Sequence, residues 1–346
     1  MRGRAHLAAA LAFALAPAAA FAEDDARAPV EIAGVVSQDG AAPAFFGPSG
    51  EIYEAIDGED TWRRRALGGV AARVRGVVRA DSKRYFAAGS RTPLYRRERG
   101  IWYAHPLPNR GRAVLSTGGH AVALGVGRHI YVFEDGEWDR RGRAPDDIAA
   151  IWAGDGERIY IATASGKLFR RDGENTSEIP HGLDDDVRVV SLIGRPGHEL
   201  YAVSTQHDVL QVGPRRARKA RIPSALRGAR IDAAGYLPDG TPAVAAAIPA
   251  AIDEDDESED SREEAPSRVA LATLRAGEMV ALGWLPDLEP GDRVVAISSR
   301  GGAPALATAR GRVVIRDGDG WRKGRVSAEP PERIGRARGS GPARSR

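Results

Sequence analysis

Short apolar runs of four to six residues recur along the whole chain, and Gly-rich or Asp-Gly turns bound them. Residues 159–162 (Ile-Tyr-Ile-Ala), 200–203 (Leu-Tyr-Ala-Val) and 130–133 (Ile-Tyr-Val-Phe) are three examples. Runs this short, rich in β-branched and aromatic residues, predict strands rather than helices. Asp-Gly predicts tight hairpins, because the turn needs positive φ and glycine adopts it without steric cost.

A second phrase also recurs: an apolar pair, basic residues, a Gly turn and then an aromatic residue. It occupies residues 94–102, 131–138 and 313–321. Each repeat therefore reads as two consecutive hairpins, or four antiparallel strands. The tryptophans near the last strand of these repeats occupy equivalent places, and we expect them to wedge between neighbouring repeats; they are Trp62, Trp102, Trp138 and Trp321.

The hairpins fall into seven units that fill residues 30–328. The units begin near Val30, Arg73, Ala113, Asp147, Val187, Ala229 and Asp292. Four strands in about 40 residues are typical of a β-propeller blade. A four-stranded sheet cannot bury both faces alone, whereas neighbours stacked around an axis can. We therefore predict an all-β, seven-bladed β-propeller with four antiparallel strands per blade.

Residues 156–173 (Gly-Glu-Arg-Ile-Tyr-Ile-Ala-Thr-Ala-Ser-Gly-Lys-Leu-Phe-Arg-Arg-Asp-Gly) carry the clearest family resemblance. The chain resembles the seven-bladed β-propellers of the broad BNR, YVTN and regulator-propeller-like group within the WD40-like superfamily. The resemblance covers about residues 30–328 and implies the fold rather than an activity. The Gly-His and Trp-Asp pair of WD40 repeats does not recur from blade to blade, and residues 57–62 only approach the Asp-box of sialidase-like propellers.

The N-terminal segment has the features of a secretory signal peptide over residues 1–22. Arg2 and Arg4 precede an apolar run over residues 7–20, and Ala20 and Ala22 are small residues at the positions that a signal peptidase reads. We expect cleavage between Ala22 and Glu23, a lead-in over residues 23–29, and a periplasmic or secreted protein. No later apolar stretch is long enough to span a bilayer.

The composition allows a hydrophobic core and excludes several kinds of functional site. Hydrophobic residues make up 42 % of the chain, which suffices for a core, and the absence of cysteine excludes disulfides, thiolate metal sites and a cysteine nucleophile. The net charge of +3 conceals an acidic run at residues 253–264, predicted as a loop inserted in blade six, and a flexible basic tail at residues 329–346. Calcium binding by the acidic run is the alternative to a solvated insertion.

No catalytic or cofactor motif is evident. The chain lacks a Gly-x-Ser-x-Gly elbow and a His-Glu-x-x-His pair, and its histidines are scattered. We therefore predict no catalytic residue, cofactor or metal. Arginine pairs recur in the later strands of the repeats, where charge protects sheet edges from aggregation. The densest basic segment is the interaction candidate, with Arg215, Arg216, Arg218, Lys219 and Arg221.

These observations favour an exported, non-enzymatic scaffold that binds another envelope or extracellular protein, or an anionic glycan. Nucleic acid is not expected as a partner of an exported chain. The alternative is a propeller hydrolase or lyase that acts on glycans at the central funnel, which would require converging polar side chains there. Calcium-dependent adhesion through residues 253–264 is a third hypothesis.

Replacing Ala20 and Ala22 with arginine should block signal-peptide cleavage, because the peptidase accepts only small side chains at these positions. N-terminal sequencing of the exported protein should find Glu23 first in the wild type and an uncleaved precursor in the variant. Replacing Ala18 and Ala19 with serine is the matched control and should leave cleavage intact. A wild-type protein that retains Met1 after export would contradict the prediction.

Overall fold

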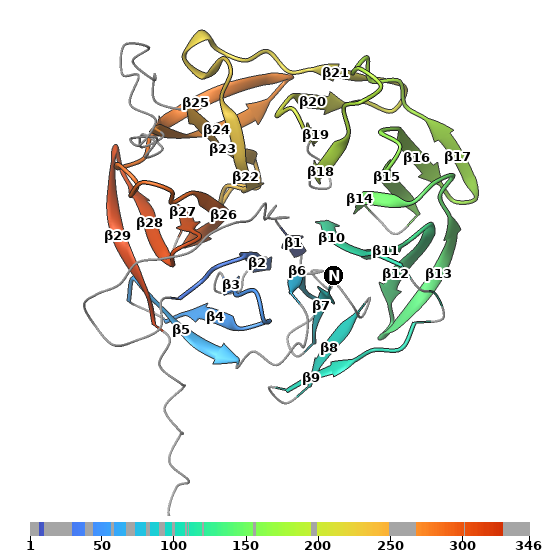
Figure 1. Ribbon diagram of the computed structural model, residues 1–346, viewed down its shortest axis with the longest axis horizontal. Coiled ribbons are helices and arrows are strands. Elements are labelled where there is room, and N and C mark those ends of the chain that lie inside the picture. The colour runs from blue at the N-terminus through green and yellow to red at the C-terminus, as the bar shows by residue number, and fades with distance from the viewer. Residues whose placement is uncertain are drawn as a thin grey trace, which may run out of the picture.

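In the computed structural model the chain forms a ring of β-sheets around a central axis (Figure 1). The structure describes residues 7–9, 30–38, 44–56, 59–66, 73–80, 84–89, 94–98, 101–107, 109, 111–119, 121–154, 157–194, 199–248, 268–300 and 302–327. Within these ranges the regular structure is strand throughout, apart from one 3-10 turn at Ser224–Leu226. The predicted all-β class is confirmed.

The strands from β2 onward form seven units of four consecutive antiparallel strands. Units 1 to 4 are β2 (Gly34–Gln38), β3 (Ala44–Phe46), β4 (Ile52–Ala55) and β5 (Thr61–Ala66); β6 (Val74–Arg79), β7 (Tyr85–Gly89), β8 (Tyr95–Glu98) and β9 (Ile101–Ala104); β10 (Ala113–Gly119), β11 (Val122–Val126), β12 (His129–Glu134) and β13 (Glu137–Arg143); and β14 (Ile148–Ala153), β15 (Arg158–Thr163), β16 (Leu168–Asp172) and β17 (Asn175–Glu178). Units 5 to 7 are β18 (Val189–Ile193), β19 (Leu200–Ser204), β20 (Val209–Val212) and β21 (Ala217–Lys219); β22 (Arg230–Tyr236), β23 (Pro242–Ile248), β24 (Arg268–Arg275) and β25 (Glu278–Trp284); and β26 (Val294–Arg300), β27 (Ala303–Thr308), β28 (Arg312–Asp317) and β29 (Gly320–Ser327).

Hydrogen bonding groups these strands into five sheets rather than the seven separate sheets that the sequence led us to expect. Units 2, 4, 5 and 6 are separate four-stranded sheets, whereas units 1, 3 and 7 belong to one sheet of thirteen strands. Two contacts cause the merger. Strand β1 (Leu7–Ala9) pairs with both β2 and β10, and β29 pairs in parallel with β5. The four-strand repeat itself is confirmed, and each predicted start lies within four residues of a first strand.

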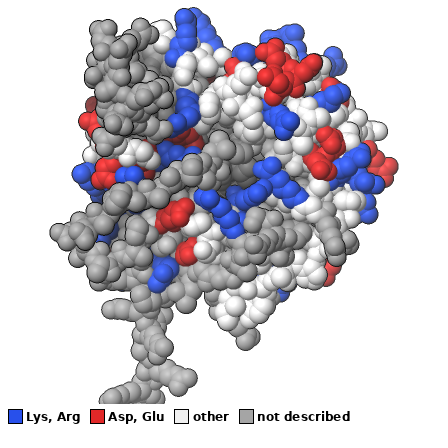
Figure 2. Space-filling view, viewed as in Figure 1, with Lys and Arg blue, Asp and Glu red and all other residues white. Residues whose placement is uncertain are grey.

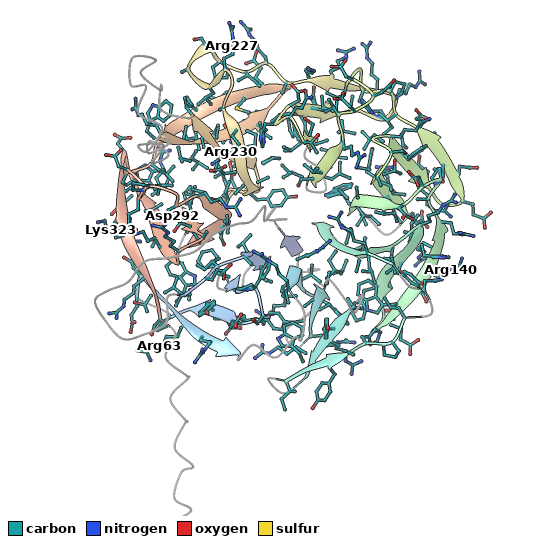
Figure 3. The ribbon with its side chains drawn as sticks, in the orientation of Figure 1. Arg63, Arg140, Arg227, Arg230, Asp292 and Lys323 are labelled. Atoms are coloured by element: carbon teal, nitrogen blue, oxygen red, sulfur yellow. The ribbon has the colours of Figure 1, made fainter. Side chains whose placement is uncertain are left out.

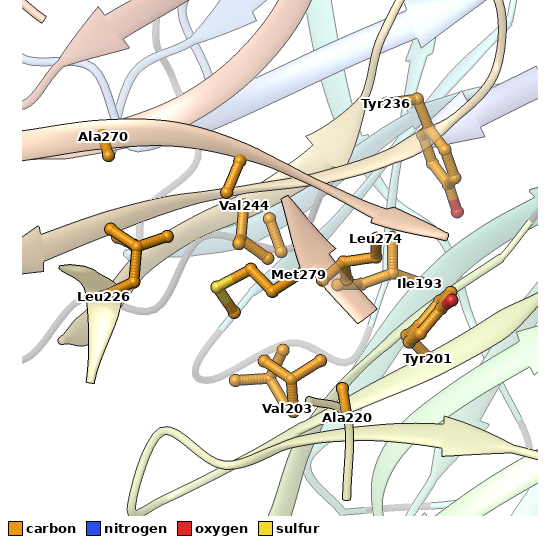
Figure 4. Packing of buried hydrophobic residues seen from close by; sticks show 14 residues of the cluster. Ile193, Tyr201, Val203, Ala220, Leu226, Tyr236, Val244, Ala270, Leu274 and Met279 are labelled. Carbon is orange, nitrogen blue, oxygen red and sulfur yellow. The ribbon is translucent and has the colours of Figure 1, made fainter. Parts of the chain in front are cut away.

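Apolar side chains fill the spaces between neighbouring units. The buried residues form seven clusters, and each cluster combines side chains of two adjacent units. Between units 5 and 6, for example, Tyr201, Val203 and Val209 pack against Val244 and other residues of β22 to β25 (Figure 4). The core is therefore distributed around the ring, because each sheet is covered only by its neighbours.

The recurring tryptophans lie at these interfaces, as predicted. Trp62 is fully buried between units 7 and 1, and Trp102 is buried between units 1 and 2. The Trp102 indole N–H donates to the Gly50 carbonyl at 2.9 Å. Trp138 and Trp321 are partly buried against the equivalent clusters. Their recurrence in the sequence therefore reflects packing between units.

The ring is closed by its last and first units. Strand β29 runs parallel to β5, with Val326 opposite Trp62, and the Arg325 N–H donates to the Asp60 carbonyl at 2.8 Å. Gly324 permits the close approach, since a Cβ there would lie 2.8 Å from the Trp62 ring. This pairing covers part of the exposed edge that an outermost strand otherwise presents.

Several predicted segments lie outside the described residues: Ala22, Glu23, the lead-in 23–29, the acidic insertion 253–264 and the tail 329–346. Signal-peptide cleavage, the insertion's role and export therefore stay predictions. Among the residues that the structure describes, no helix has the length and apolar character needed to cross a membrane.

Replacing Trp62 with alanine should lower the free energy of unfolding by about 3–5 kcal/mol, because it empties the interface that closes the ring. Urea denaturation followed by circular dichroism measures the change. The matched control is Tyr103→Ala, since that side chain is 51 % exposed and its loss should cost less than about 0.5 kcal/mol. Equal effects of the two substitutions would show that Trp62 is not a closure residue.

Candidate docking surface

The predicted basic segment spans the turn between β20 and β21 and continues along β21, the outermost strand of unit 5. Arg215 and Arg216 lie in the turn, Arg218 and Lys219 lie on the strand, and Arg221 follows it; all five are exposed. Consecutive strands are antiparallel, so the turns between first and second strands and between third and fourth strands share one face of the ring. We call this the turn face, and it carries Arg215 and Arg216.

The structure divides the predicted patch into two parts. The Lys219 ammonium pairs with Asp208 at 3.0 Å, and the Arg221 guanidinium lies 3.4 Å from Glu278 in unit 6. The Arg221 backbone also bridges the units, since its N–H donates to the Gly277 carbonyl at 2.7 Å and its carbonyl accepts from the Met279 N–H at 2.9 Å. Lys219 and Arg221 therefore have anionic neighbours within the fold, and the interaction role expected of all five residues stays a prediction.

The other three arginines line a groove on the turn face, which we call the basic groove. Its volume is about 450 Å³, and its lining comprises Glu199, Gln211, Val212, Gly213, Pro214, Arg215, Arg216 and Arg218. Within the described part of the chain, the guanidinium groups of Arg215, Arg216 and Arg218 form no ion pair or hydrogen bond. The groove thus presents three arginines without an ion pair beside Val212 and Pro214, with the single carboxylate of Glu199 in its wall.

Glu199 forms the inner wall of the basic groove and is held by three donors. Its carboxylate accepts from the Gln211 amide at 2.7 Å, from the Ala276 backbone N–H at 2.7 Å and from the Tyr201 hydroxyl. Burial, followed by the hydrogen bond to Glu199, raises the pKa of Tyr201, so this phenol stays a donor at neutral pH. The Glu199 carboxylate therefore accepts hydrogen bonds from within the protein, and one of these bonds joins unit 5 to the β24–β25 turn of unit 6.

A second groove adjoins the first on the far side of Glu199. It encloses about 630 Å³ and is lined by Glu199, Asp239, Thr241, Pro242, Leu274, Arg275 and Ala276. Arg275 donates to Asp239 at 3.0 Å and to the Thr241 hydroxyl at 2.9 Å, so its charge is locally compensated. The two grooves share Glu199 but differ in charge: the three arginines leave the basic groove net positive, whereas Glu199 and Asp239 against Arg275 leave its neighbour net negative.

The described residues offer little support for chemistry at a metal centre. No three His, Asp or Glu side chains in the described ranges lie close enough together to hold a metal ion. The ionisable side chains of the two grooves are the unpaired Arg215, Arg216 and Arg218, the paired Arg275, and carboxylates with assigned donors. What this arrangement can do is bind anionic groups, because guanidinium donors match carboxylate oxygens in a bidentate geometry.

Sequence reasoning found the arginines but missed Glu199, Gln211 and Arg275. Glu199 precedes β19, Gln211 lies on β20 and Arg275 ends β24, and the contact between Glu199 and Ala276 spans 77 residues of sequence. A local pattern of charges reveals Arg215 to Arg218. No local signal predicts that a carboxylate will accept a hydrogen bond from a neighbouring unit.

Comparisons with known proteins agree on the fold. The WD40 β-propeller domain of Doa1 is similar over 90 % of this chain and 96 % of its own, with a TM-score of 0.55 and 12 % identity. YCF48 from Cyanidioschyzon merolae is similar over 83 % of this chain and 95 % of its own, with a TM-score of 0.52 and 13 % identity. A YCF48 structure bound to D1 peptide covers 71 % of this chain and 80 % of its own, with a TM-score of 0.49 and 15 % identity.

No family model matches the chain, and no curated protein matches it significantly. The class that the architecture defines is the β-propeller with four antiparallel strands per unit. The likeness of the chain to the Doa1 propeller domain and to YCF48 agrees with this fold.

Replacing Glu199 with alanine should lower the free energy of unfolding by about 2 kcal/mol, because one carboxylate accepts from three donors of units 5 and 6 and all three lose their acceptor. Urea denaturation checks this expectation. Glu174→Ala removes an exposed carboxylate and should change stability by less than about 0.5 kcal/mol. If Glu199→Ala matched that control, Glu199 would not link the two units.

Proposed function

We propose that this chain is a non-enzymatic interaction scaffold that docks an acidic segment of a partner protein in the basic groove. The observation that carries the proposal is the set of three exposed arginines, Arg215, Arg216 and Arg218, which have no anionic partner among the described residues. Guanidinium groups held side by side repel one another, and carboxylates of a bound segment relieve this repulsion.

The lining of the groove favours a peptide over a glycan. Val212 and Pro214 provide apolar surface next to the arginines, so the groove suits a ligand that carries both apolar and acidic side chains. The edge of β21 is covered at both ends, since the Ala217 N–H donates to the Pro180 carbonyl at 2.8 Å and the Arg221 N–H donates to Gly277. The segment therefore binds through side chains rather than by adding a strand.

The partner is an envelope or extracellular protein if residues 1–22 direct export as the sequence predicts. Electrostatic attraction at an exposed groove accelerates association and weakens as salt is added. Affinity should accordingly fall as the sodium chloride concentration rises.

Binding can be measured with a fluorescein-labelled peptide that alternates Glu and Leu, by fluorescence anisotropy. The triple variant Arg215→Gln, Arg216→Gln and Arg218→Gln should bind at least about tenfold more weakly, which corresponds to about 1.4 kcal/mol. Circular dichroism should show an unchanged fold, because all three side chains are exposed.

A control variant removes the same charge elsewhere on the rim: Arg140→Gln, Arg143→Gln and Lys323→Gln (Arg140 and Lys323 are labelled in Figure 3). This control should bind the peptide within about twofold of the wild type. Equal binding by both variants would overturn the proposal. Binding of an oligogalacturonate in place of the peptide would identify an anionic glycan as the ligand and also overturn it.

A further inference from the structure

A cleft lies between units 2 and 3, in a different sector of the ring from the basic groove. Its volume is about 430 Å³, within the range of about 300–1,000 Å³ that is typical of ligand pockets. Five of its lining residues carry an aromatic or imidazole ring: Phe86, His105, Tyr131, Phe133 and Trp138. We call it the aromatic cleft, and the function proposed above does not involve it.

Unit 2 supplies one wall of the aromatic cleft as a row of side chains across its sheet. Phe86 on β7 lies opposite Arg96 on β8, and Arg96 lies opposite Tyr103 on β9. Cross-strand partners point to the same face of a sheet. Phe86 belongs to the apolar cluster between units 2 and 3, so all three side chains face unit 3. Exposure rises along the row from 1 % at Phe86 to 51 % at Tyr103, and the row therefore runs from the floor of the cleft to the surface.

Unit 3 supplies the other wall from two cross-strand pairs of β12 and β13. Phe133 lies opposite Trp138, and Tyr131 lies opposite Arg140. The rings of Phe133 and Trp138 meet Phe86 edge to face, with centroids 4.9 and 5.1 Å from the Phe86 centroid. Such contacts between aromatic rings are favourable. The floor of the cleft is thus an aromatic surface that both units build together.

Arg84 of unit 2 fastens this floor to unit 3. Its guanidinium lies over the Phe133 ring, 5.1 Å from the centroid, and donates to the Gly136 carbonyl at 3.2 Å. The β12–β13 turn is therefore positioned against unit 2. A wall that is already positioned binds a ligand without the entropic cost of ordering it.

Apolar surface continues from the cleft onto β9, the outermost strand of unit 2. Among the described residues the strongly exposed large hydrophobic side chains are Ile101 (58 %), Tyr103 and Val280, and two of these three lie on β9. Alternate residues of a strand share a face, so Ile101 also lies on the side of Tyr103. Figure 2 shows uncharged surface at the part of the rim where Figure 1 places β9. Exposed apolar surface beside a pocket is typical of a protein-binding site.

The charge at the cleft is positive on balance. Arg96 and Arg140 line it against one carboxylate, that of Glu137. His105 is neutral at pH 7, because burial and then the charge of Arg96 lower its pKa. Arg140 is exposed and forms no ion pair with any residue that the structure describes. Its guanidinium is therefore available to a carboxylate from outside the chain.

We propose that the aromatic cleft binds an aromatic anchor side chain of a partner protein, with an acidic residue next to that anchor in the partner's sequence. The rings of the floor receive the anchor, Tyr103 and Ile101 contact the segment around it, and Arg140 pairs with the acidic side chain. Aromatic side chains seated in a pocket often dominate the binding energy of an interface. The exposed residues of β9 favour a protein over a small aromatic acid, because a small ligand would leave them uncovered.

Isothermal titration calorimetry of the full chain with a synthetic peptide tests this inference. The peptide carries one Trp-Asp pair in an otherwise Gly-Ser sequence. Replacing the peptide's Trp with alanine should weaken binding at least about tenfold, because the anchor is lost. Replacing its Asp with asparagine should weaken binding at least about threefold, because the pair with Arg140 is lost.

Two variants of the protein test the same contacts from the other side. Arg140→Glu should weaken binding of the Trp-Asp peptide at least about fivefold, and Tyr103→Ala at least about threefold. Circular dichroism should show an unchanged fold for both, because both side chains are exposed. The matched control is Arg143→Glu. That exposed arginine lies on the same strand but does not line the cleft, and the variant should bind within about twofold of the wild type.

Absence of binding, equal binding of the Trp and Ala peptides, or equal loss in Arg140→Glu and Arg143→Glu would overturn the inference. Phenylacetate that binds more tightly than the peptide would assign the cleft to a small aromatic acid and also overturn it. So would self-association that Tyr103→Ala abolishes in analytical ultracentrifugation, since the occupant would then be a second copy of the chain. The triple variant of the basic groove should bind the Trp-Asp peptide normally, which separates a failure here from a failure of the proposed function.

Discussion

Each four-strand unit presents two apolar faces, and neither face can be covered from within the unit. Burial of apolar surface is the dominant favourable term in folding, so every unit needs a neighbour on both sides. Closure of the ring satisfies this requirement, and the seven interfacial clusters are its result. The fully buried Trp62 belongs to the apolar cluster that closes the ring between units 7 and 1.

Polar links between units add specificity to this apolar packing. Gly194 is the clearest case: its carbonyl accepts from the Trp152 indole and the Tyr236 hydroxyl, each at 2.6 Å, and thereby joins units 4, 5 and 6. Glu199 and Arg221 serve a similar purpose nearer the rim. These hydrogen bonds and ion pairs add direction to the apolar packing between neighbouring units.

The same closure leaves the turns free for function. A rigid ring holds its turns at fixed positions, and turns tolerate changes that strands do not. The turn face therefore carries Arg215, Arg216 and Arg218 beside Val212 and Pro214.

The sequence by itself determined the strand class, the four-strand repeat and the places of the wedging tryptophans, since all three follow from short-range periodicity and turn chemistry. It also located Arg215 to Arg218 as a dense basic segment. Only the tertiary structure decided that Arg221 and Lys219 are occupied by ion pairs, that Glu199 meets Ala276 across 77 residues, and that β29 pairs with β5 and merges separate sheets into one. These outcomes depend on how one unit is rotated against the next, and no local pattern encodes that rotation.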